Sequence, residues 1–290
     1  MEGVTGPSWL EVLTRLHWID AWWTPFLRIS TGVPRVGRLR RWLGPYTGTG
    51  LPVIAQLMGC DTGKLAAAAA RLASLGAVMV DLNCACPSRD VLSSHAGGWR
   101  MRDPQWIGET LLAMREACGG KTPVSVKLRA GWDKTDFAET VAPVLNAVKP
   151  EMVTVHFRTV SEGYRPVEDG LARLRRIRES LPGLTLYGSG DLFTVADIRR
   201  MFECAGVDGA APARGLLRNP RLLADYAEAG AGGGTGGLTA AGQRQFLAEI
   251  ARAGASRGFV LQLASNFYGS SSPQFRCVLD EIAANGTIGK

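Results

Sequence analysis

The sequence predicts an α/β fold of the (β/α)8 or TIM barrel class, with its first strand missing or reduced and a short C-terminal helical extension. Two observations support this prediction. Short apolar runs alternate with amphipathic helical patterns over the first 226 residues, which is typical of a parallel sheet covered by helices. A length of 290 residues with 46% hydrophobic content suits one barrel-sized domain and a small appendage.

The strands are predicted from short runs rich in apolar and β-branched residues. Seven such runs lie at 26–29, 52–57, 77–82, 124–128, 152–155, 184–187 and 207–211. Helical patterns lie between them at 62–75, 104–118, 137–148, 167–180 and 194–204. Several of these begin with an Asp, Ser or Thr cap and have a proline near the first turn. Repeats of this length favour a barrel over an open sheet.

A complete barrel needs eight strands, and the sequence offers seven. A helical pattern at 7–16 begins almost at Met1, so the strand that should precede it is missing or reduced to a stub. Either the true start lies upstream, or another segment plugs that side of the barrel.

Composition divides the chain into three parts. Residues 1–228 form the barrel domain, 229–239 a glycine-rich linker, and 240–290 a short helical tail. Helical patterns at 240–255 and 273–284 flank a polar turn in the tail. They offer too little apolar surface for an independent core, so we expect them to pack against the barrel.

A net charge of +7 makes polyanions plausible partners. Arginines cluster at 35–41 and at 173–178. The first cluster interleaves with Trp42 and Tyr46, which suits phosphate contact and base stacking. The second falls in an amphipathic pattern and is interpreted as a solvated helix face.

The cysteines and the apolar runs indicate the compartment. Six cysteines are scattered over the chain, which is not typical of a secreted disulfide framework, so we expect reduced thiols. Cys84 and Cys86 have no second Cys or His pair at zinc-site spacing, and no metal is expected. No apolar run is long enough to cross a bilayer, and no signal pattern opens the chain. We therefore expect a cytoplasmic protein.

Cys86 is the strongest catalytic candidate. It lies in the segment Asn83-Cys84-Ala85-Cys86-Pro87, directly after an apolar strand run, and reactive groups in α/β enzymes gather at such strand ends. A thiol with an ordinary pKa of about 8.5 stays mostly protonated at neutral pH and can give a proton to carbon. The alternative is an inert buried cysteine that only fills space.

Six motifs at predicted strand ends carry a family resemblance. They are Gln56 in PVIAQLMG, DLNCACP at 81–87, VKLRAGWD at 126–133, VHFRT at 155–159 with GYR at 163–165, GSGD at 188–191, and ARGLLRNP at 213–220. In this order and spacing the chain resembles the tRNA-dihydrouridine synthases from Met1 to about Tyr226. The bacterial branch with a tRNA-binding helical tail is most similar.

The resemblance implies an FMN-dependent enzyme that uses NADPH to reduce a specific uridine in tRNA to 5,6-dihydrouridine. A hydride would pass from flavin N5 to C6 of a flipped uridine, and Cys86 would protonate C5. It also implies a tRNA-binding role for the tail and a monomer. The cofactor-binding residues would be Gln56, Lys127, His156, Ser189, Gly190, Asp191, Ala213, Arg214 and Gly215. The residues that contact RNA or the uridine would be Asn83, Arg89, Arg129, Arg158, Tyr164 and Arg165.

General physics supports two of these roles. Lys127 ends an apolar strand, where its positive charge would stabilise an anionic reduced flavin. Gly190, Arg214 and Gly215 follow the last two strands, where barrels bind phosphate with backbone N–H groups.

The sequence departs from the family pattern at several positions. Ala85 and Ala213 replace glycines, Ser189 replaces an asparagine, and Trp99 and Arg100 stand where the family has small or aliphatic residues. Two alternatives to the proposed activity stay open at this point. One is a flavin barrel oxidoreductase with a small unsaturated substrate, and the other is a catalytically impaired barrel that binds RNA.

Overall fold

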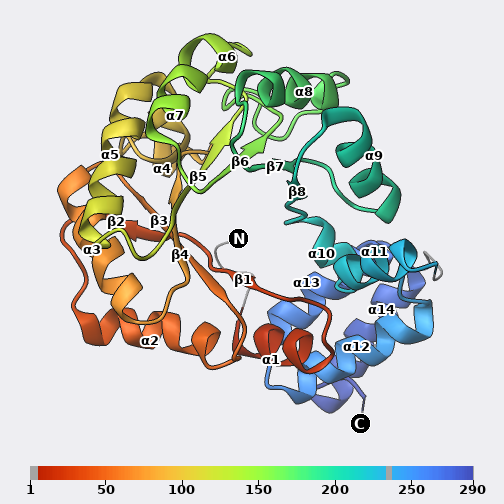
Figure 1. The fold of residues 1–290 in the computed structure, drawn as a ribbon. Coiled ribbons are helices and arrows are strands. Elements are labelled where there is room, and N and C mark those ends of the chain that lie inside the picture. Colours follow the sequence, from red (N-terminus) through yellow and green to blue (C-terminus); the bar gives the residue numbers. More distant parts are fainter. Residues whose placement is uncertain (1–5, 233–236, 290) are drawn as a thin grey trace. The chain divides into compact units, whose positions relative to one another are not determined.

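The computed structural model describes residues 6–232 and 237–289, and its chain falls into two compact units (Figure 1). The sheet unit comprises Ala21–Gly190 and Arg199–Ala211. The helical unit comprises Met1–Asp20, Asp191–Ile198 and Pro212–Lys290.

The sheet unit is built on parallel strands. Their order is β1-β3-β4-β5-β6-β7-β8, and β2 also pairs with β3. The strands are β1 (Trp22–Trp23), β2 (Leu27–Ile29), β3 (Val53–Gly59), β4 (Met79–Asn83), β5 (Val124–Arg129), β6 (Met152–His156), β7 (Leu186–Ser189) and β8 (Gly209–Ala210). Figure 1 shows them as a curved wall with helices on its outer side. The predicted barrel class is confirmed, and so are all seven predicted strands.

The helices of the sheet unit follow the strands in sequence. They are α2 (Val36–Thr47), α3 (Thr62–Ser74), α4 (Arg89–Leu92), the 3-10 helix η1 (Gly97–Arg102), α5 (Pro104–Ala117), α6 (Phe137–Thr140), α7 (Ala142–Val148), α8 (Gly170–Ser180) and α9 (Val195–Ala205), whose first four residues belong to the helical unit. Strand β3 is buried almost throughout because helices cover one face and the interior of the curved sheet covers the other. Burial on both faces therefore explains why the strands appear in the sequence as continuous apolar runs.

The first part of the barrel is the least regular. β1 and β2 both lie parallel against β3, with Trp22 beside Val53 and Leu27 beside Leu57. Among the described residues, the sheet ends at β1 on one side and β8 on the other. The expected position of the missing strand, before the helix at 7–16, falls on residues 1–5, which lie outside the described ranges.

Strand register brings several predicted site residues to one end of the sheet. Asn83 pairs with Lys127 on the neighbouring strand. Arg129 pairs with His156, and His156 pairs with Ser189. All of these residues lie at or near the carboxyl ends of their strands, where a barrel holds its reactive groups.

The helical unit contains α1 (Pro7–Arg15), α10 (Gly215–Arg218), α11 (Leu222–Gly230), α12 (Ala240–Arg252), α13 (Arg257–Tyr268) and α14 (Pro273–Asn285). Its core is aromatic, because Trp9 packs edge-on against Phe246 and Phe259, each at 5.9 Å between ring centroids. An ion pair between Arg15 and Glu249 adds a contact at 2.6 Å. α1 is thus fastened to α12 and α13.

Three helix predictions need correction. The predicted helix at 137–148 is two helices that meet at Val141, because Pro143 cannot donate a backbone hydrogen bond at the start of α7. The predicted helix at 167–180 begins only at Gly170. The predicted polar turn of the tail contains α13, which Ser256 caps by accepting a bond from the N–H of Phe259.

The first arginine cluster lies on a helix that the sequence analysis did not predict. In α2 the buried residues Leu39, Leu43 and Tyr46 are spaced four and three apart, which is the helical period. The four arginines of the cluster are exposed.

Gly131, just after β5, offers a direct test of the fold. Its φ is 150°, and an added Cβ would lie 1.8 Å from the carbonyl oxygen of Lys134. We expect Gly131→Ala to lower the free energy of unfolding by about 3 kcal/mol, since backbone would have to move. Urea denaturation would measure it.

Gly37→Ala is the matched control, because no atom lies within 4 Å of its added Cβ and the residue is helical. It should raise stability by about 0.5 kcal/mol. Equal effects of the two substitutions would contradict the described turn after β5.

Candidate functional site

The backbone around Cys86 is held by hydrogen bonds from three segments. The side-chain oxygen Oδ1 of Asn83 accepts from the backbone N–H groups of Ala85 at 3.0 Å and Cys86 at 3.1 Å. The carbonyl of Cys86 accepts from the N–H of Gly98 at 2.9 Å. The carbonyl of Ala85 accepts from Nε of Arg129 at 2.8 Å. These hydrogen bonds therefore fix the backbone that carries the Cys86 thiol.

The loop after β4 folds back tightly over this cysteine. An added Cβ at Gly98 would lie 2.8 Å from the Cys86 carbonyl oxygen and 2.9 Å from the Val160 side chain. The half-buried Cys86 side chain packs on a small core formed by Met58, Val91 and Ala96. The thiol is thus neither deeply buried nor fully in solvent.

A chain of buried polar groups lies behind Asn83. Its Nδ2 donates to Oε1 of Gln56 at 2.8 Å, and Nε2 of Gln56 donates to a carboxylate oxygen of Asp81 at 2.7 Å. The second oxygen of Asp81 accepts from the hydroxyl of Ser125 at 2.7 Å. The hydroxyl of Thr24 accepts from the backbone N–H of Gln56 at 3.0 Å. All five side chains are buried, so this hydrogen-bonded network lies inside the sheet unit.

Asp81 is fully buried, and this desolvation raises the pKa of its carboxyl from 3.8 to about 6. Hydrogen bonds from Ser125 and Gln56 and the nearby charge of Lys127 act in the opposite direction and limit the rise. Asp81 is therefore mostly ionised at pH 7, when it can only accept hydrogen bonds.

Lys127 lies on β5 beside this network. Burial lowers the pKa of its ammonium, the carboxylate of Asp81 opposes that change, and the guanidinium of Arg129 adds to it. Cys86 is also close enough to act on it electrostatically. The side chain keeps partial exposure to solvent, so its charge is available to a ligand.

His156, at the end of β6, has a defined tautomer. Its Nδ1 accepts from the backbone N–H of Arg158 at 3.2 Å, so the neutral ring carries its proton on Nε2. The ring is 8% exposed and packs near Phe157 and Tyr164, with centroids at 5.3 and 6.3 Å. The Nε2–H of His156 therefore lies at the end of β6. With Lys127 and Ser189, it gives the strand ends a cation, a ring N–H and a hydroxyl.

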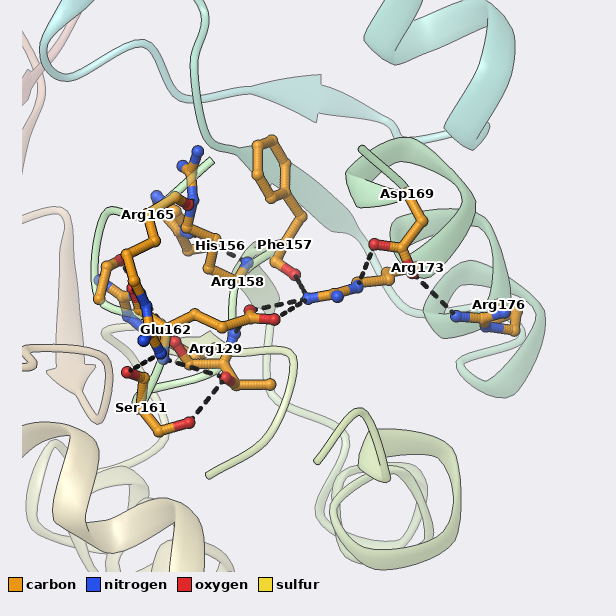
Figure 2. A network of polar contacts seen from close by, with 12 residues as sticks. Arg129, His156, Phe157, Arg158, Ser161, Glu162, Arg165, Asp169, Arg173 and Arg176 are labelled. Atoms are coloured by element: carbon orange, nitrogen blue, oxygen red, sulfur yellow. Dashed lines mark hydrogen bonds and ion pairs between the residues drawn. The ribbon is translucent and has the colours of Figure 1, made fainter. Parts of the chain in front are cut away.

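Two predicted RNA-contacting arginines, which are labelled in the polar network of Figure 2, are buried instead of exposed. Arg129 and Arg158 are each 2% exposed. Arg129 donates to the carbonyls of Thr159 at 3.0 Å and Gly163 at 2.6 Å, and Arg158 donates to the carbonyl of Arg165. Both arginines thus bind the loop that follows β6, and Arg129 also binds the loop after β4, while their contact with RNA stays a prediction.

Glu162 completes the support of that loop, as Figure 2 shows. Its carboxylate accepts from the N–H of Thr159 at 2.8 Å and from Arg173 at 2.8 Å. Burial disfavours the charged carboxylate, but these bonds outweigh it and lower the pKa of Glu162. Arg173 belongs to the second arginine cluster, so this arginine is structural and not simply solvated.

Three predicted RNA-contacting residues are exposed: Arg89 in α4, and Tyr164 and Arg165 in the loop after β6. Tyr164 is 58% exposed, although the carbonyl before it is held by Arg129. An exposed aromatic ring on a fixed backbone suits a stacking contact.

The predicted cofactor-binding residues after β7 and β8 lie in both units. In the helical unit, Arg214 forms an ion pair with Asp191 at 2.6 Å, next to Ala213. An added Cβ at Gly215 would lie 1.9 Å from the carbonyl oxygen of Leu192.

In the sheet unit, the hydroxyl of Ser189 donates to the carbonyl of Ala211 at 3.2 Å. Gly190 has a φ of 128°, and an added Cβ there would lie 2.4 Å from the Phe157 ring. Both glycines are therefore required by packing within their own units.

Thr24, Asp81 and Ser125 were not predicted as site residues from the sequence. The available signal was Asp81 itself, a charged residue inside an apolar strand run. In the part of the chain that the structure describes, no group of three His, Cys, Asp or Glu side chains could hold a metal ion. No helix there has the length and apolarity that crossing a membrane requires.

The buried carboxyl of Asp81 makes stability depend on pH. Since its folded pKa of about 6 exceeds the ordinary 3.8, the folded state binds more protons between these values, and stability falls as pH rises through them. We expect the wild type to lose about 2 kcal/mol relative to Asp81→Asn between pH 4 and pH 7.

Urea denaturation of both proteins across this range would measure the difference. Ser74→Ala, on an exposed helix end, serves as a control whose difference from wild type stays constant with pH. A pH-independent difference for Asp81→Asn would contradict the raised pKa.

Comparison with known proteins agrees with this geometry. Residues 24–234 match the family model described as "Dihydrouridine synthase (Dus)". A tRNA-dihydrouridine(16) synthase of Vibrio vulnificus is 34% identical over 232 residues, covering 77% of this chain and 71% of the relative. One of Aquipseudomonas alcaligenes is 30% identical over 239 residues, covering 80% of this chain and 75% of the relative.

Solved structures support the fold alone. A 2-naphthoyl-CoA reductase complex has a TM-score of 0.59 at 12% identity, covering 78% of this chain and 47% of that chain. A structure described as "Crystal structure of TcOYE with pHBA" has a TM-score of 0.57 at 9% identity, covering 81% and 85%. Because the family model matches residues 24–234, which are most of this chain, the chain belongs to the dihydrouridine synthase family of enzymes.

Proposed function

We propose that this protein reduces a uridine in tRNA to 5,6-dihydrouridine, with FMN as cofactor, NADPH as reductant and Cys86 as the proton donor to C5. The observation that carries the proposal is the half-buried Cys86 thiol, whose backbone is fixed by Asn83, Gly98 and Arg129. The relatives named above are uridine-16 enzymes by name, so position 16 is the one we propose.

The residues at the strand ends fit FMN. Lys127 offers a cation, and His156 and Ser189 add polar side chains at the same strand ends, which together suit an acceptor-rich ring that becomes anionic on reduction. Bound and reduced FMN would supply a hydride to C6 of the uracil ring. Gln56 already uses one N–H and one oxygen lone pair in the buried network, which fixes the orientation of its amide toward this region.

In the helical unit, Arg214 and Gly215 are proposed to bind the phosphate of FMN, as the family resemblance implies. The ion pair with Asp191 orients the Arg214 guanidinium, and that supports a charged role for the arginine.

Cys86 has one task in this proposal. Its thiol holds a proton until hydride addition creates negative charge at C5, and then gives that proton from Sγ. The C5=C6 bond is thereby reduced, and a thiolate remains on Cys86. Solvent then returns a proton to the thiolate.

The exposed residues Arg89, Tyr164 and Arg165 are proposed to contact the tRNA around a flipped uridine. The division into a catalytic part at 1–228, a linker at 229–239 and a tRNA-binding tail at 240–290 belongs to this proposal. So do a monomeric state and a cytoplasmic location, where tRNA is modified.

Cys86→Ala tests the assigned role. We expect the variant to form dihydrouridine at least about 100-fold more slowly, because the ring then lacks its positioned acid. The measurement is dihydrouridine content of unmodified tRNA, resolved by position, after incubation with FMN and NADPH.

Cys60→Ser is the matched control, since this cysteine is exposed and follows β3. It should react at the parent rate. Parent-rate activity of Cys86→Ala would remove Cys86 from the mechanism, and a wild type that modifies no uridine would refute the proposed reaction.

A further inference from the structure

We propose that His95, Trp99, Arg102 and Trp132 form a platform, here called the Trp99 strip, that stacks and holds an unpaired RNA nucleotide next to the target uridine. This inference rests on the proposed function, because it assigns part of the substrate to a surface of the same unit.

The side chains of the strip form a row in which each contacts the next, from His95 through Trp99 and Arg102 to Trp132. The His95 and Trp99 rings are 4.5 Å apart between centroids and tilted by 33°. The guanidinium carbon of Arg102 lies 5.7 Å from the Trp99 ring and 5.2 Å from the Trp132 ring. One arginine thus bridges two tryptophans that stand 33 positions apart in the sequence.

The strip is fixed to the candidate catalytic loop. Trp99 follows Gly98, whose N–H donates to the Cys86 carbonyl at 2.9 Å. Trp132 follows Gly131, and its own carbonyl accepts from the N–H of Ser161 at 2.9 Å. The loops after β4, β5 and β6 therefore meet here, at the carboxyl ends of the strands, where the uridine would enter.

The side chains of the strip are available to a partner. His95 and Arg102 are exposed, and both tryptophans are partly exposed. No ion pair of Arg102 is found within the described ranges, so its charge is not neutralised by this chain there. His95 adopts a left-handed backbone with a φ of 55°, a conformation uncommon outside glycine.

Neighbouring Arg100 shows what a structural arginine looks like in the same segment. It is 9% exposed, lies 3.8 Å from the Trp106 ring and donates to the carbonyl of Cys60 at 2.8 Å. Arg102, two residues on, has none of this burial. Arg100 therefore supports the structure of η1, whereas η1 presents Arg102 to solvent.

The chemistry of the strip selects single-stranded RNA. Partly exposed aromatic rings stack on bases of any sequence, and an unneutralised arginine attracts phosphate. A uridine flipped out of the tRNA fold leaves flanking nucleotides unpaired, and these are the groups that such a surface can hold. The competing surface is α2, where exposed arginines surround Trp42.

Binding of unmodified tRNA to Trp99→Leu, Trp132→Leu and Trp42→Leu, measured by fluorescence anisotropy at fixed salt, tests the inference. We expect each substitution in the strip to weaken binding by about 5- to 100-fold, with thermal unfolding checked for each variant. Trp42→Leu should change affinity less than either. Wild-type affinity for both strip variants, or a larger loss for Trp42→Leu, would overturn the inference.

Arg102→Gln provides a second readout that does not depend on a large side chain. The logarithm of the affinity falls as the logarithm of the salt concentration rises. We expect Arg102→Gln to make this negative slope shallower by about 0.7 to 0.9, which corresponds to the loss of one phosphate contact. Arg175→Gln, an exposed arginine on α8, should leave the slope unchanged. An unchanged slope for Arg102→Gln would count against the strip.

Dihydrouridine formation by the wild type is measured in parallel. A wild type that binds tRNA through the strip but reduces no uridine refutes the proposed reaction and keeps the strip. A wild type that reduces uridine while all strip variants bind normally refutes the strip alone.

Discussion

The carboxylate of Asp81 sets the direction of the hydrogen bonds on which the candidate site depends. An ionised carboxylate only accepts, so Gln56 must turn its Nε2 toward Asp81 and its Oε1 toward Asn83. Asn83 must then donate to Gln56 and offer its own oxygen to the N–H groups of Ala85 and Cys86. One buried charge, fixed inside β4, thereby orients two amides and the backbone of the reactive cysteine.

A second set of contacts joins this loop to its neighbours. Arg129 donates to the carbonyl of Ala85 and also to carbonyls of the loop after β6. Gly98 lies between Cys86 and Val160, where no larger residue fits. A shift of any of these loops would move the others, so the proposed roles of the thiol, Tyr164 and the Trp99 strip are coupled through the backbone.

The sequence predicted the strands well because parallel strands buried on both faces read as continuous apolar runs. β1 was missed because two residues carry no periodicity. Cys86 could be proposed from its place after a strand, but the hydrogen bonds of Asp81 could not be predicted, since they cross to β3 and β5 and leave no spacing pattern. Arg129 and Arg158 look like RNA-binding residues by type, and only the folded chain shows their burial. The pairing of Arg102 with Trp132 is equally long-range.

The central claim is that Asn83 acts through Cys86, and a double-mutant cycle on the rate of uridine reduction in tRNA tests it most directly. Asn83→Ala should slow the reaction in the wild type, because it releases two N–H groups of the cysteine loop, and should add nothing in the Cys86→Ala background. The same fold-loss in both backgrounds would contradict the account, since Asn83 would then act on the uridine independently of the cysteine.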